Sequence, residues 1–239
     1  MAQRSRGKVA GPVKIRVDVL LVERGLAPSR ERARALILAG RVLVNEQKIE
    51  KPGVTVHADA PVRLLGDDMP YVSRGGLKLA AALDRWKIEL AGRACLDVGA
   101  STGGFTDCLL QHGAVHVTAV DTGFGQIAMK LRNDPRVRLV ERTNARFLAP
   151  GALAEPGSPE LTLLVMDVSF ISATLLLEPV LAAAPGLREA VILVKPQFEA
   201  GRGNVGKGGI VRDPEAHALA VERVAECVRS LGWQVVETT

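Results

Sequence analysis

The sequence predicts an α/β protein in which a doubly wound, parallel sheet follows a smaller N-terminal unit. From residue 91 onward, short apolar runs alternate with longer stretches of helical periodicity, the pattern that builds parallel sheets. Charge divides the chain at the same place: residues 1–90 hold 17 Lys and Arg against 10 Asp and Glu, and residues 91–239 hold 14 against 16. Several apolar runs also end in Asp or Lys, as expected where ligands bind beyond the carboxyl ends of strands.

Composition narrows the class of protein. Of the 239 residues, 47% are hydrophobic but only 3% are aromatic, which indicates a globular protein with an aliphatic core. No apolar run reaches the roughly 18–20 residues that a membrane span needs. The basic tail over residues 1–13 lacks the apolar segment of a secretory signal. Three scattered cysteines without metal-ligand spacing favour a reducing cytoplasm and predict neither a metal site nor a disulfide framework.

Residues 14–66 are expected to form a small α+β domain. Apolar residues at helical spacing precede Gly25, and a second helix is predicted from Ser29, its N-cap, to Gly40, its C-terminal glycine. Two short strands about a turn at residues 45–47 and a further strand over residues 62–65 complete the unit.

The second predicted helix carries arginines on one face. Arg30 and Arg34 are spaced i,i+4, and Arg41 follows just beyond the helix. Guanidinium groups suit phosphates because they can form paired hydrogen bonds, so this face is a candidate RNA-binding surface. A solvated charged face is the alternative, and composition alone leaves both open.

A linker and a first helix are expected over residues 67–90. Ser73 and two glycines precede an apolar repeat, with Arg74 and Lys78 near the helix start. A cation is poorly placed at the positive end of a helix dipole. Either a functional role or simple solvent exposure explains why a lysine stands at this position.

Residues 91–239 are expected to form the sheet domain. Helices are predicted within the stretches "FTDCLLQHG", "ATLLLEPVLAAA" and "PEAHALAVERVAECVRSLG". The predicted strands are residues 94–98, 115–120, 137–140, 161–166, 190–194 and 233–237.

The first strand of this domain runs into a glycine-rich turn, "LDVGASTGGFTD". Gly99, Gly103 and Gly104 leave room for a ligand to approach the backbone. Their spacing differs from the GxGxxG dinucleotide fingerprint, which disfavours a nicotinamide cofactor. Asp97, just before the glycines, suits a cationic ligand end such as the amino group of S-adenosylmethionine (SAM).

Four further polar residues follow predicted strands. Asp121 stands where an acid bonds ribose hydroxyls in nucleoside-binding folds, and Asn144 could bond an adenine edge. Asp167 ends the fourth strand, and Lys195 ends the fifth, where Pro196 is expected to stop it.

A competing interpretation concerns "GRGNVGKG" at residues 201–208, which nearly matches a phosphate-binding P-loop. Gly208 stands where a hydroxyl must hold magnesium, and the loop follows the candidate aspartate strand instead of preceding it, so we reject this interpretation. Two readings remain open: a loop that places Arg202 and Lys207 over a polyanionic substrate, or a plain flexible connection.

Several long stretches together resemble a known family. "LILAGRVLVN" is similar to S4 RNA-binding domains, and the chain from about residue 14 to 239 resembles the TlyA-type (hemolysin A) ribosomal RNA methyltransferases, which join an S4 domain to an FtsJ/RrmJ-like domain. The stretches that carry this resemblance are "YVSRGGLKL", "LDVGASTGGFTDCLL", "LRNDPRVRLVERTNAR", "MDVSFIS" and "VKPQFEAGRGNVGKGGIVRDP".

The resemblance implies SAM-dependent 2′-O-methylation of cytidine in ribosomal RNA, with a Rossmann-like catalytic domain. Lys78, Asp167 and Lys195 match three members of the family's Lys-Asp-Lys-Glu tetrad. The glutamate is expected on a last strand beyond Thr239, and Glu237 does not match it, so the chain looks truncated at its C-terminus. An RNA-binding protein with an impaired methyltransferase domain is therefore the alternative. A pore-forming hemolysin has no support in the sequence.

The expected partners are ribosomal RNA or ribosomal subunits, with neither a membrane nor an obligate protein partner. The candidate cofactor-binding residues are Asp97, Gly99, Ala100, Ser101, Gly103, Gly104, Phe105, Asp121, Asn144 and Asp167. The candidate RNA-binding residues are Arg30, Arg34, Arg41, Arg74, Arg202 and Lys207.

Overall fold

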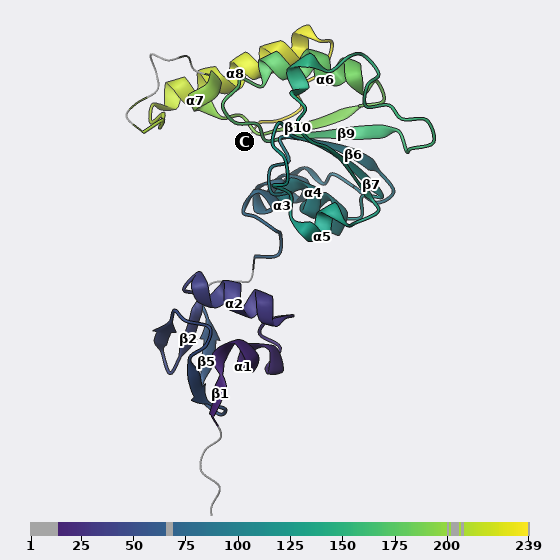
Figure 1. Cartoon of the computed structure of the whole chain (residues 1–239). Helices are drawn as coiled ribbons and strands as arrows, with labels where there is room; N and C mark the ends of the chain where they lie inside the picture. Colours follow the sequence, from purple (N-terminus) through teal and green to yellow (C-terminus); the bar gives the residue numbers. More distant parts are fainter. Residues whose placement is uncertain (1–13, 66–68, 200, 202–205, 207, 239) are drawn as a thin grey trace, which may run out of the picture. The chain divides into compact units, whose positions relative to one another are not determined.

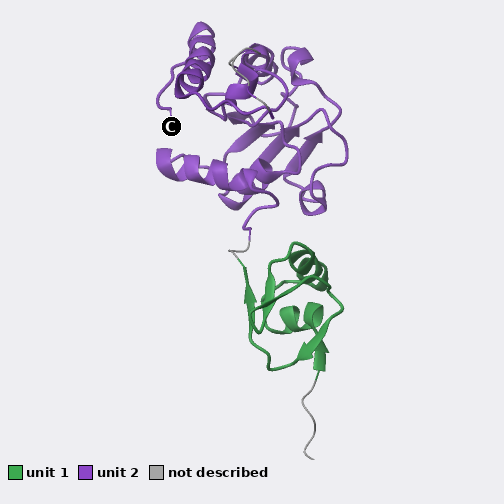
Figure 2. Cartoon of the chain, turned by 90° about the vertical axis from the view of Figure 1, so that its left-hand side faces the viewer, with its two compact units in different colours: residues 1–68 green, residues 69–239 purple. Residues whose placement is uncertain are grey.

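The computed structural model describes residues 14–65, 69–199, 201, 206 and 208–238. The chain divides into two compact units, Met1–Asp68 and Met69–Thr239 (Figure 2). The division falls 22 residues before the boundary after residue 90 across which the charges were compared. Each unit has a hydrophobic core of its own.

The first unit combines two helices with short antiparallel strands. Strand β2 lies between β3 and β5 in one sheet, and β1 pairs with β4 in another. Its elements are β1 (Lys14–Arg16), α1 (Val17–Glu23), α2 (Arg30–Leu38), β2 (Val42–Val44), β3 (Gln47–Ile49), β4 (Thr55–His57) and β5 (Val62–Leu64).

Capping residues and turn residues explain where most elements of this unit begin and end. The Ser29 hydroxyl accepts a hydrogen bond from the Arg32 amide at the start of α2, and Gly40 takes a positive φ of 67° after its end, as predicted. Asn45 and Glu46 both take positive φ in the turn between β2 and β3. Strands β1 and β4 were not predicted, because three residues are too few to show an alternating pattern.

The second unit alternates helices and strands. None of the helices in the described part of the chain is long and apolar enough to cross a membrane. The elements are α3 (Gly75–Trp86), β6 (Ala94–Val98), α4 (Gly104–Gln111), β7 (His116–Val120), α5 (Met129–Arg132), β8 (Val137–Val140), η1 (Ala145–Phe147), β9 (Leu161–Met166), α6 (Thr174–Ala183), β10 (Glu189–Ile192), α7 (Pro196–Glu199) and α8 (Pro214–Ser230).

The sheet of this unit is parallel throughout, with strand order β10-β9-β6-β7-β8 (Figure 1). The chain builds outward from β6 to β8, then returns to place β9 on the other side of β6. The order therefore reverses between β6 and β9, and such a switch point is where ligands bind in doubly wound sheets. The predicted fold class is confirmed.

Side chains alternate between the two faces of the sheet, and each face has a helical layer (Figure 1). Cys95, Val117, Leu163 and Val165 pack with Leu79 and Leu83 of α3, Leu109 of α4 and Leu131 of α5. Leu96, Val98, Leu164 and Met166 pack with Leu176, Leu177 and Val180 of α6 and Val224 of α8. These aliphatic layers hold the carboxyl edge of the sheet in place.

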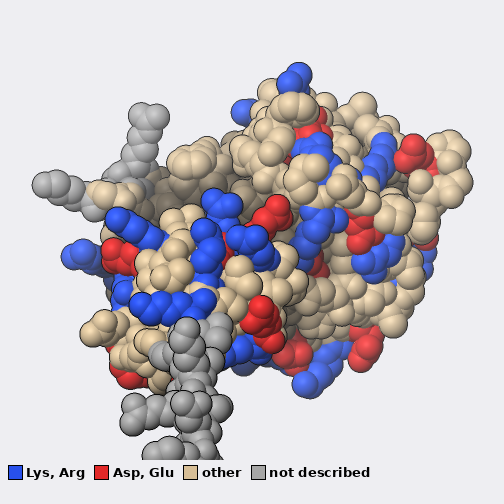
Figure 3. All heavy atoms as spheres, turned by 60° about the horizontal axis from the view of Figure 1, so that its bottom comes forward, with Lys and Arg blue, Asp and Glu red and all other residues tan. Residues whose placement is uncertain are grey.

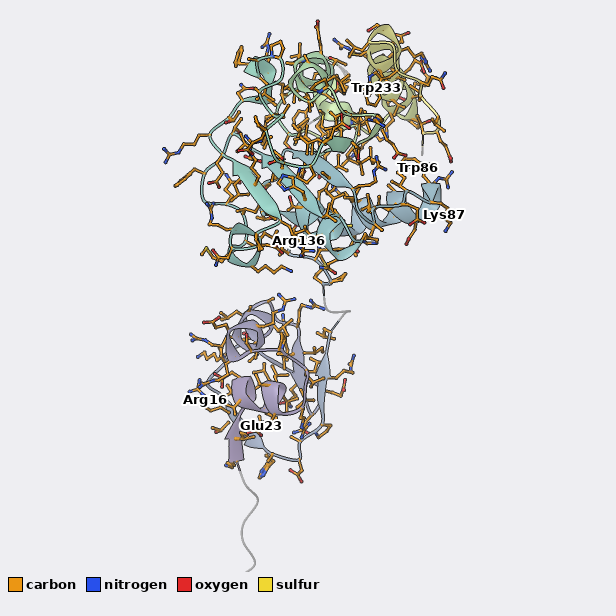
Figure 4. All side chains as sticks on the ribbon, turned by 90° about the vertical axis from the view of Figure 1, so that its right-hand side faces the viewer. Arg16, Glu23, Trp86, Lys87, Arg136 and Trp233 are labelled. Carbon is orange, nitrogen blue, oxygen red and sulfur yellow. The ribbon has the colours of Figure 1, made fainter. Side chains whose placement is uncertain are left out.

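Two strand predictions are corrected. Residues 233–237 form no strand; they run instead to α3, where Glu237 pairs with Arg85. Figure 4 labels Trp233, where this segment leaves α8, and Trp86 and Lys87, at the end of α3. Strand β10 ends at Ile192, two residues earlier than predicted, and Pro196 begins α7. Proline suits the first turn of a helix, whose amide needs no intrahelical partner.

Candidate active site and RNA-binding surfaces

Asp167 lies between two lysines at the carboxyl edge of the sheet. Lys195 Nζ is 2.6 Å from Asp167 Oδ1, and Lys78 Nζ is 4.0 Å from Asp167 Oδ2. The side chains of Asp167 and Lys195 are 17% and 19% exposed, whereas that of Lys78 is 54% exposed. The structure thus brings together all three predicted catalytic residues, from α3 and from the loops after β9 and β10.

Ser169 is a member of this cluster that sequence reasoning missed. Its Oγ accepts a hydrogen bond of 2.6 Å from Lys195 Nζ. Ser169 stands two residues after Asp167, and in extended chain such a pair projects to the same side. That spacing in "MDVSF" was the available signal. Together Asp167 and Ser169 give the Lys195 ammonium two oxygen partners.

Gly99 lets the two loops at the switch point approach each other. It takes a φ of 88°, and a Cβ there would lie 2.8 Å from the carbonyl oxygen of Asp167. The Asp167 amide also donates to Val98 O at 3.1 Å. Because Gly99 has no side chain, the backbone of Asp167 can approach it closely.

Asp97 is a fully buried carboxyl at the end of β6. Its Oδ2 accepts a 2.6 Å hydrogen bond from the Thr106 hydroxyl, and its Oδ1 has no hydrogen-bond partner. Burial raises the pKa of Asp97 to about 7, against the opposing effect of the Thr106 bond. A buried acceptor without a partner is costly, so this carboxyl suits a bound group that carries hydrogen-bond donors and positive charge.

Asp121 organises the turn after β7. Its two carboxylate oxygens accept hydrogen bonds from the backbone amides of Ser101, at 2.8 Å, and Gly123, at 2.6 Å. It thereby links the glycine-rich turn after β6 to the next strand along the sheet edge. A small pocket at this place is lined by Ala100, Ser101, Ala119, Asp121, Gly123, Gln126, Ile127, Leu139 and Glu141.

Three residues of the glycine-rich turn have evident packing roles. Side chains at Gly103 and Gly104 would overlap Leu131 and the Ser73 hydroxyl, respectively. Phe105 is 5% exposed and belongs to the core beneath α3 and α4. Their predicted part in binding a cofactor stays a prediction, and what they do in the structure is seat α4 against its neighbours.

Asn144 lies on the surface after β8. Its Oδ1 accepts a hydrogen bond from the Arg146 amide and so caps the short helix η1. The capping bond uses the amide oxygen, so the NH₂ group remains the available donor toward a ligand. Its predicted contact with adenine stays a prediction.

The first unit fixes some predicted RNA-binding arginines to its own structure. Arg30 pairs at 3.1 Å with Asp18, a fully buried carboxylate that Arg16 also contacts, at 2.9 Å. Arg41 Nε donates to Leu65 O at 2.9 Å. Arg34 is exposed on α2.

Beyond this unit, Arg74 is exposed just before α3. Arg202 and Lys207 lie outside the described residues. The face shown in Figure 3 carries many Lys and Arg side chains, with Asp and Glu between them.

An aromatic pair stands beside the lysine–aspartate cluster. Phe170 is 93% exposed and takes an unfavourable φ of 66°; its ring centroid lies 5.5 Å from that of Phe198. Both rings line a groove with Arg146, Ile171, Ser172, Leu175, Gln197 and Gly201. An aromatic side chain exposed to this extent in a strained backbone is typical of a binding surface.

Comparison with known proteins identifies both units. An FtsJ-like methyltransferase model matches residues 71–239, and an S4 domain model matches residues 15–62. YqxC of Bacillus subtilis is 51% identical over 92% of this chain and 77% of its own. The 16S/23S rRNA (cytidine-2′-O)-methyltransferase TlyA of Mycobacterium tuberculosis is 47% identical over 93% of this chain and 82% of its own.

A solved structure of a Streptococcus thermophilus protein, 43% identical, superimposes with a TM-score of 0.63 over 91% of this chain and 78% of its own. The matches therefore extend over both units. This chain belongs to the TlyA-type family, in which an S4 domain precedes an FtsJ-like methyltransferase domain.

Proposed function

We propose that this chain transfers a methyl group from SAM to the 2′-hydroxyl of a cytidine ribose in ribosomal RNA. The observation that carries the proposal is the cluster of Lys78, Asp167 and Lys195 at the switch point of the sheet. Family membership supports the reaction class, and the name of the mycobacterial relative supports the substrate.

The residues around the switch point fit SAM. Asp97 has a buried oxygen without a partner and would hold the ammonium group. Asp121, at the end of the neighbouring strand, would hold the ribose hydroxyls through the lone pairs that its amide contacts leave free. When bound, SAM supplies a methyl group that its sulfonium already activates.

Lys195 is the residue best placed to handle the proton. A ribose hydroxyl is a weak nucleophile, so transfer needs a group that accepts its proton. Lys195 would do so in its neutral form, and Asp167 and Ser169 would then stabilise the ammonium that results. Lys78 approaches the other oxygen of the same carboxylate and would help to orient the ribose.

Exposed side chains of both units would bind the RNA. The rings of Phe170 and Phe198 offer a stacking surface for an unpaired base next to Lys195. Arg30, Arg34 and Arg41 would contact phosphates from the S4 domain, and Arg74 from the start of α3. Arg202 and Lys207 remain candidates on sequence grounds alone.

Methyl transfer from labelled SAM to 30S and 50S subunits tests the proposal. Subunits should come from cells that lack the gene, so that the target is unmodified. We expect label in rRNA as ribose methylation at a cytidine, which protects the adjoining linkage from alkaline hydrolysis. Label on a base would contradict the 2′-hydroxyl assignment. Binding of subunits without any transfer would favour the impaired, RNA-binding alternative.

A further inference from the structure

We propose that Glu199 is a positioning residue that holds Lys195 at the Asp167 carboxylate, an inference that rests on the proposed function. Glu199 is the last residue of α7 and is only 2% exposed. A carboxylate buried to this extent is costly unless hydrogen bonds satisfy its oxygens. The contacts of Glu199 connect the two loops that carry the catalytic candidates.

The Glu199 carboxylate binds the beginning of α6. Oε1 accepts a 2.7 Å hydrogen bond from the Ala173 amide, and Oε2 accepts one from the Ser172 hydroxyl. The Ser172 hydroxyl lies 2.6 Å from that of Thr174. The hydrogen bonds around the Glu199 carboxylate thus involve three consecutive residues, 172 to 174. The first amides of a helix lack intrahelical partners, and an anion is favoured there by the helix dipole. Glu199 therefore caps α6 from a different element.

The contact matters because the sheet ends before the catalytic candidates begin. The last paired residues of β9 and β10 are Met166 and Ile192, and one more amide, that of Leu193, still donates to Met166 O. Asp167 and Lys195 both lie beyond this pairing. The ladder between β9 and β10 therefore does not fix the separation of their side chains, although the Asp167 amide is still bonded to Val98 O of β6.

Glu199 supplies a connection at the far end of both loops. It stands one helical turn after Lys195, whose carbonyl accepts the Phe198 amide at 2.9 Å. Its partners Ser172 and Ala173 follow Asp167 by five and six residues. The two loops are thus held by the sheet at one end and by the Glu199 carboxylate at the other.

Helix α8 also contacts Glu199, through its backbone. Arg223 donates to the Glu199 carbonyl oxygen at 2.9 Å. This bond fixes the backbone at the end of α7, while the carboxylate fixes its position relative to α6. A shift of either loop changes the distance between Lys195 Nζ and Asp167, and displacements near 1 Å can reduce turnover about 100-fold.

Glu199→Ala, Glu199→Gln and Ser172→Ala test the inference, with Glu222→Ala as the matched control. Glu222 is an exposed glutamate on α8 that pairs with Arg229. We expect Glu199→Ala to lower kcat by roughly 10- to 100-fold. The KM for ribosomal subunits and the Kd for SAM should change less than about threefold, since neither ligand contacts Glu199 in the proposed function. Glu199→Gln retains an acceptor for the Ala173 amide and should restore most of kcat.

Amide hydrogen exchange gives a readout that does not depend on activity. Glu199→Ala should speed exchange at Ala173, whose amide loses its acceptor, and Glu222→Ala should not. Should Glu199→Ala fail to fold, Ser172→Ala removes one of the two carboxylate bonds and should give a smaller loss of kcat in the same direction.

Wild-type kcat in Glu199→Ala, or in Ser172→Ala where the first does not fold, would overturn the inference. A parallel weakening of SAM and RNA binding that Glu199→Gln does not rescue would overturn it as well. Failure of the unaltered chain to methylate RNA would contradict the proposed function instead.

Discussion

Lys195 Nζ and Asp167 Oδ1 lie 2.6 Å apart, although 27 residues separate them in the chain and neither belongs to a strand. They follow β10 and β9, which are neighbours in the sheet. Ser169 and Lys78 complete the polar surroundings of this pair. The arrangement places an amine against a carboxylate at the switch point where a ligand is expected.

Replacing Lys195 by alanine should abolish methyl transfer while SAM still binds. Loss of a general base costs roughly 100- to 10,000-fold in rate. The carboxylates proposed to hold the ammonium and ribose of SAM are Asp97 and Asp121, whereas the carboxylate partner of Lys195 is Asp167. Single-turnover transfer to ribosomal subunits measures the first effect, and calorimetric titration with SAM the second. Turnover like that of the unaltered protein would refute the assignment of Lys195.

Lys78 can be tested against Lys87, which caps the C-terminal end of the same helix. Lys78→Ala removes the cation 4.0 Å from Asp167 and should lower kcat at least about tenfold. Lys87→Ala, at the far end of α3, removes the same charge from an exposed position and should leave kcat unchanged (Figure 4). Equal effects of the two changes would mean that Lys78 acts only through general electrostatics or stability.

Asp97 should make SAM binding dependent on pH. Its pKa is raised to about 7 by burial, so the carboxyl is largely neutral below that pH in the free protein. A cationic ligand favours the charged form, and its Kd should therefore rise as pH falls below 7, by at most about tenfold per pH unit. Asp97→Asn should bind SAM weakly with a flat profile; an unchanged profile would exclude Asp97 as the partner of the ammonium group.

The same carboxyl should affect stability in the free protein. The folded state holds this proton more tightly than the unfolded state, in which the carboxyl has its ordinary pKa of 3.8. The contribution of Asp97 to the free energy of unfolding is therefore fully present below about pH 4 and declines as pH rises toward 7. Urea unfolding across this range should show that the free energy of unfolding of Asp97→Asn rises relative to that of the unaltered protein as pH increases. A constant difference would mean that the pKa is not raised.

Gly99 and Gly92 form a matched pair for substitution. Both have positive φ, at 88° and 76°, but a Cβ at Gly99 meets the Asp167 backbone whereas one at Gly92 meets nothing within 4 Å. Gly92→Ala should cost about 1–2 kcal/mol for the left-handed backbone alone. Gly99→Ala should cost more and also lower kcat, because it displaces Asp167. Equal losses of stability with unchanged kcat would show that the contact is unimportant.

Arg34 should contribute to RNA affinity through a phosphate contact. Arg34→Ala should weaken binding at low salt and reduce the slope of log K against log salt by about 0.7–0.9. Arg188→Ala removes an exposed arginine that pairs with Glu160 and serves as the control. If Arg34→Ala leaves the slope unchanged, Arg34 makes no phosphate contact and belongs to a solvated charged face.

Local patterns predicted most elements, and the resemblance to the TlyA-type family supplied the candidate catalytic residues. Apolar runs marked β6 through β10, because burial between two helical layers demands continuous apolar residues. The predicted strand over residues 233–237 was wrong: alternation there reflects a segment that packs without strand partners. The end of β10 was misplaced because Val194 is apolar but lies beyond the last pair of the ladder.

Glu199 shows where sequence reasoning ended. Nothing in "KPQFE" distinguishes a surface glutamate from a buried one, because its partners Ser172 and Ala173 lie 27 and 26 residues earlier. Phe105 shows the reverse case, since a residue of the glycine-rich turn proved to be part of the core.

The sequence by itself determined most of the strands and helices, the glycine-rich turn and the polar residues at strand ends. It did so because periodicity and turn chemistry report how each segment meets its own surroundings. Only the tertiary structure decided that Lys195 meets Asp167 and Ser169, that Gly99 makes room for the Asp167 backbone, and that Glu199 joins their loops. Those contacts join residues far apart in the chain, and their distances depend on how β9, β10, α6 and α7 pack together.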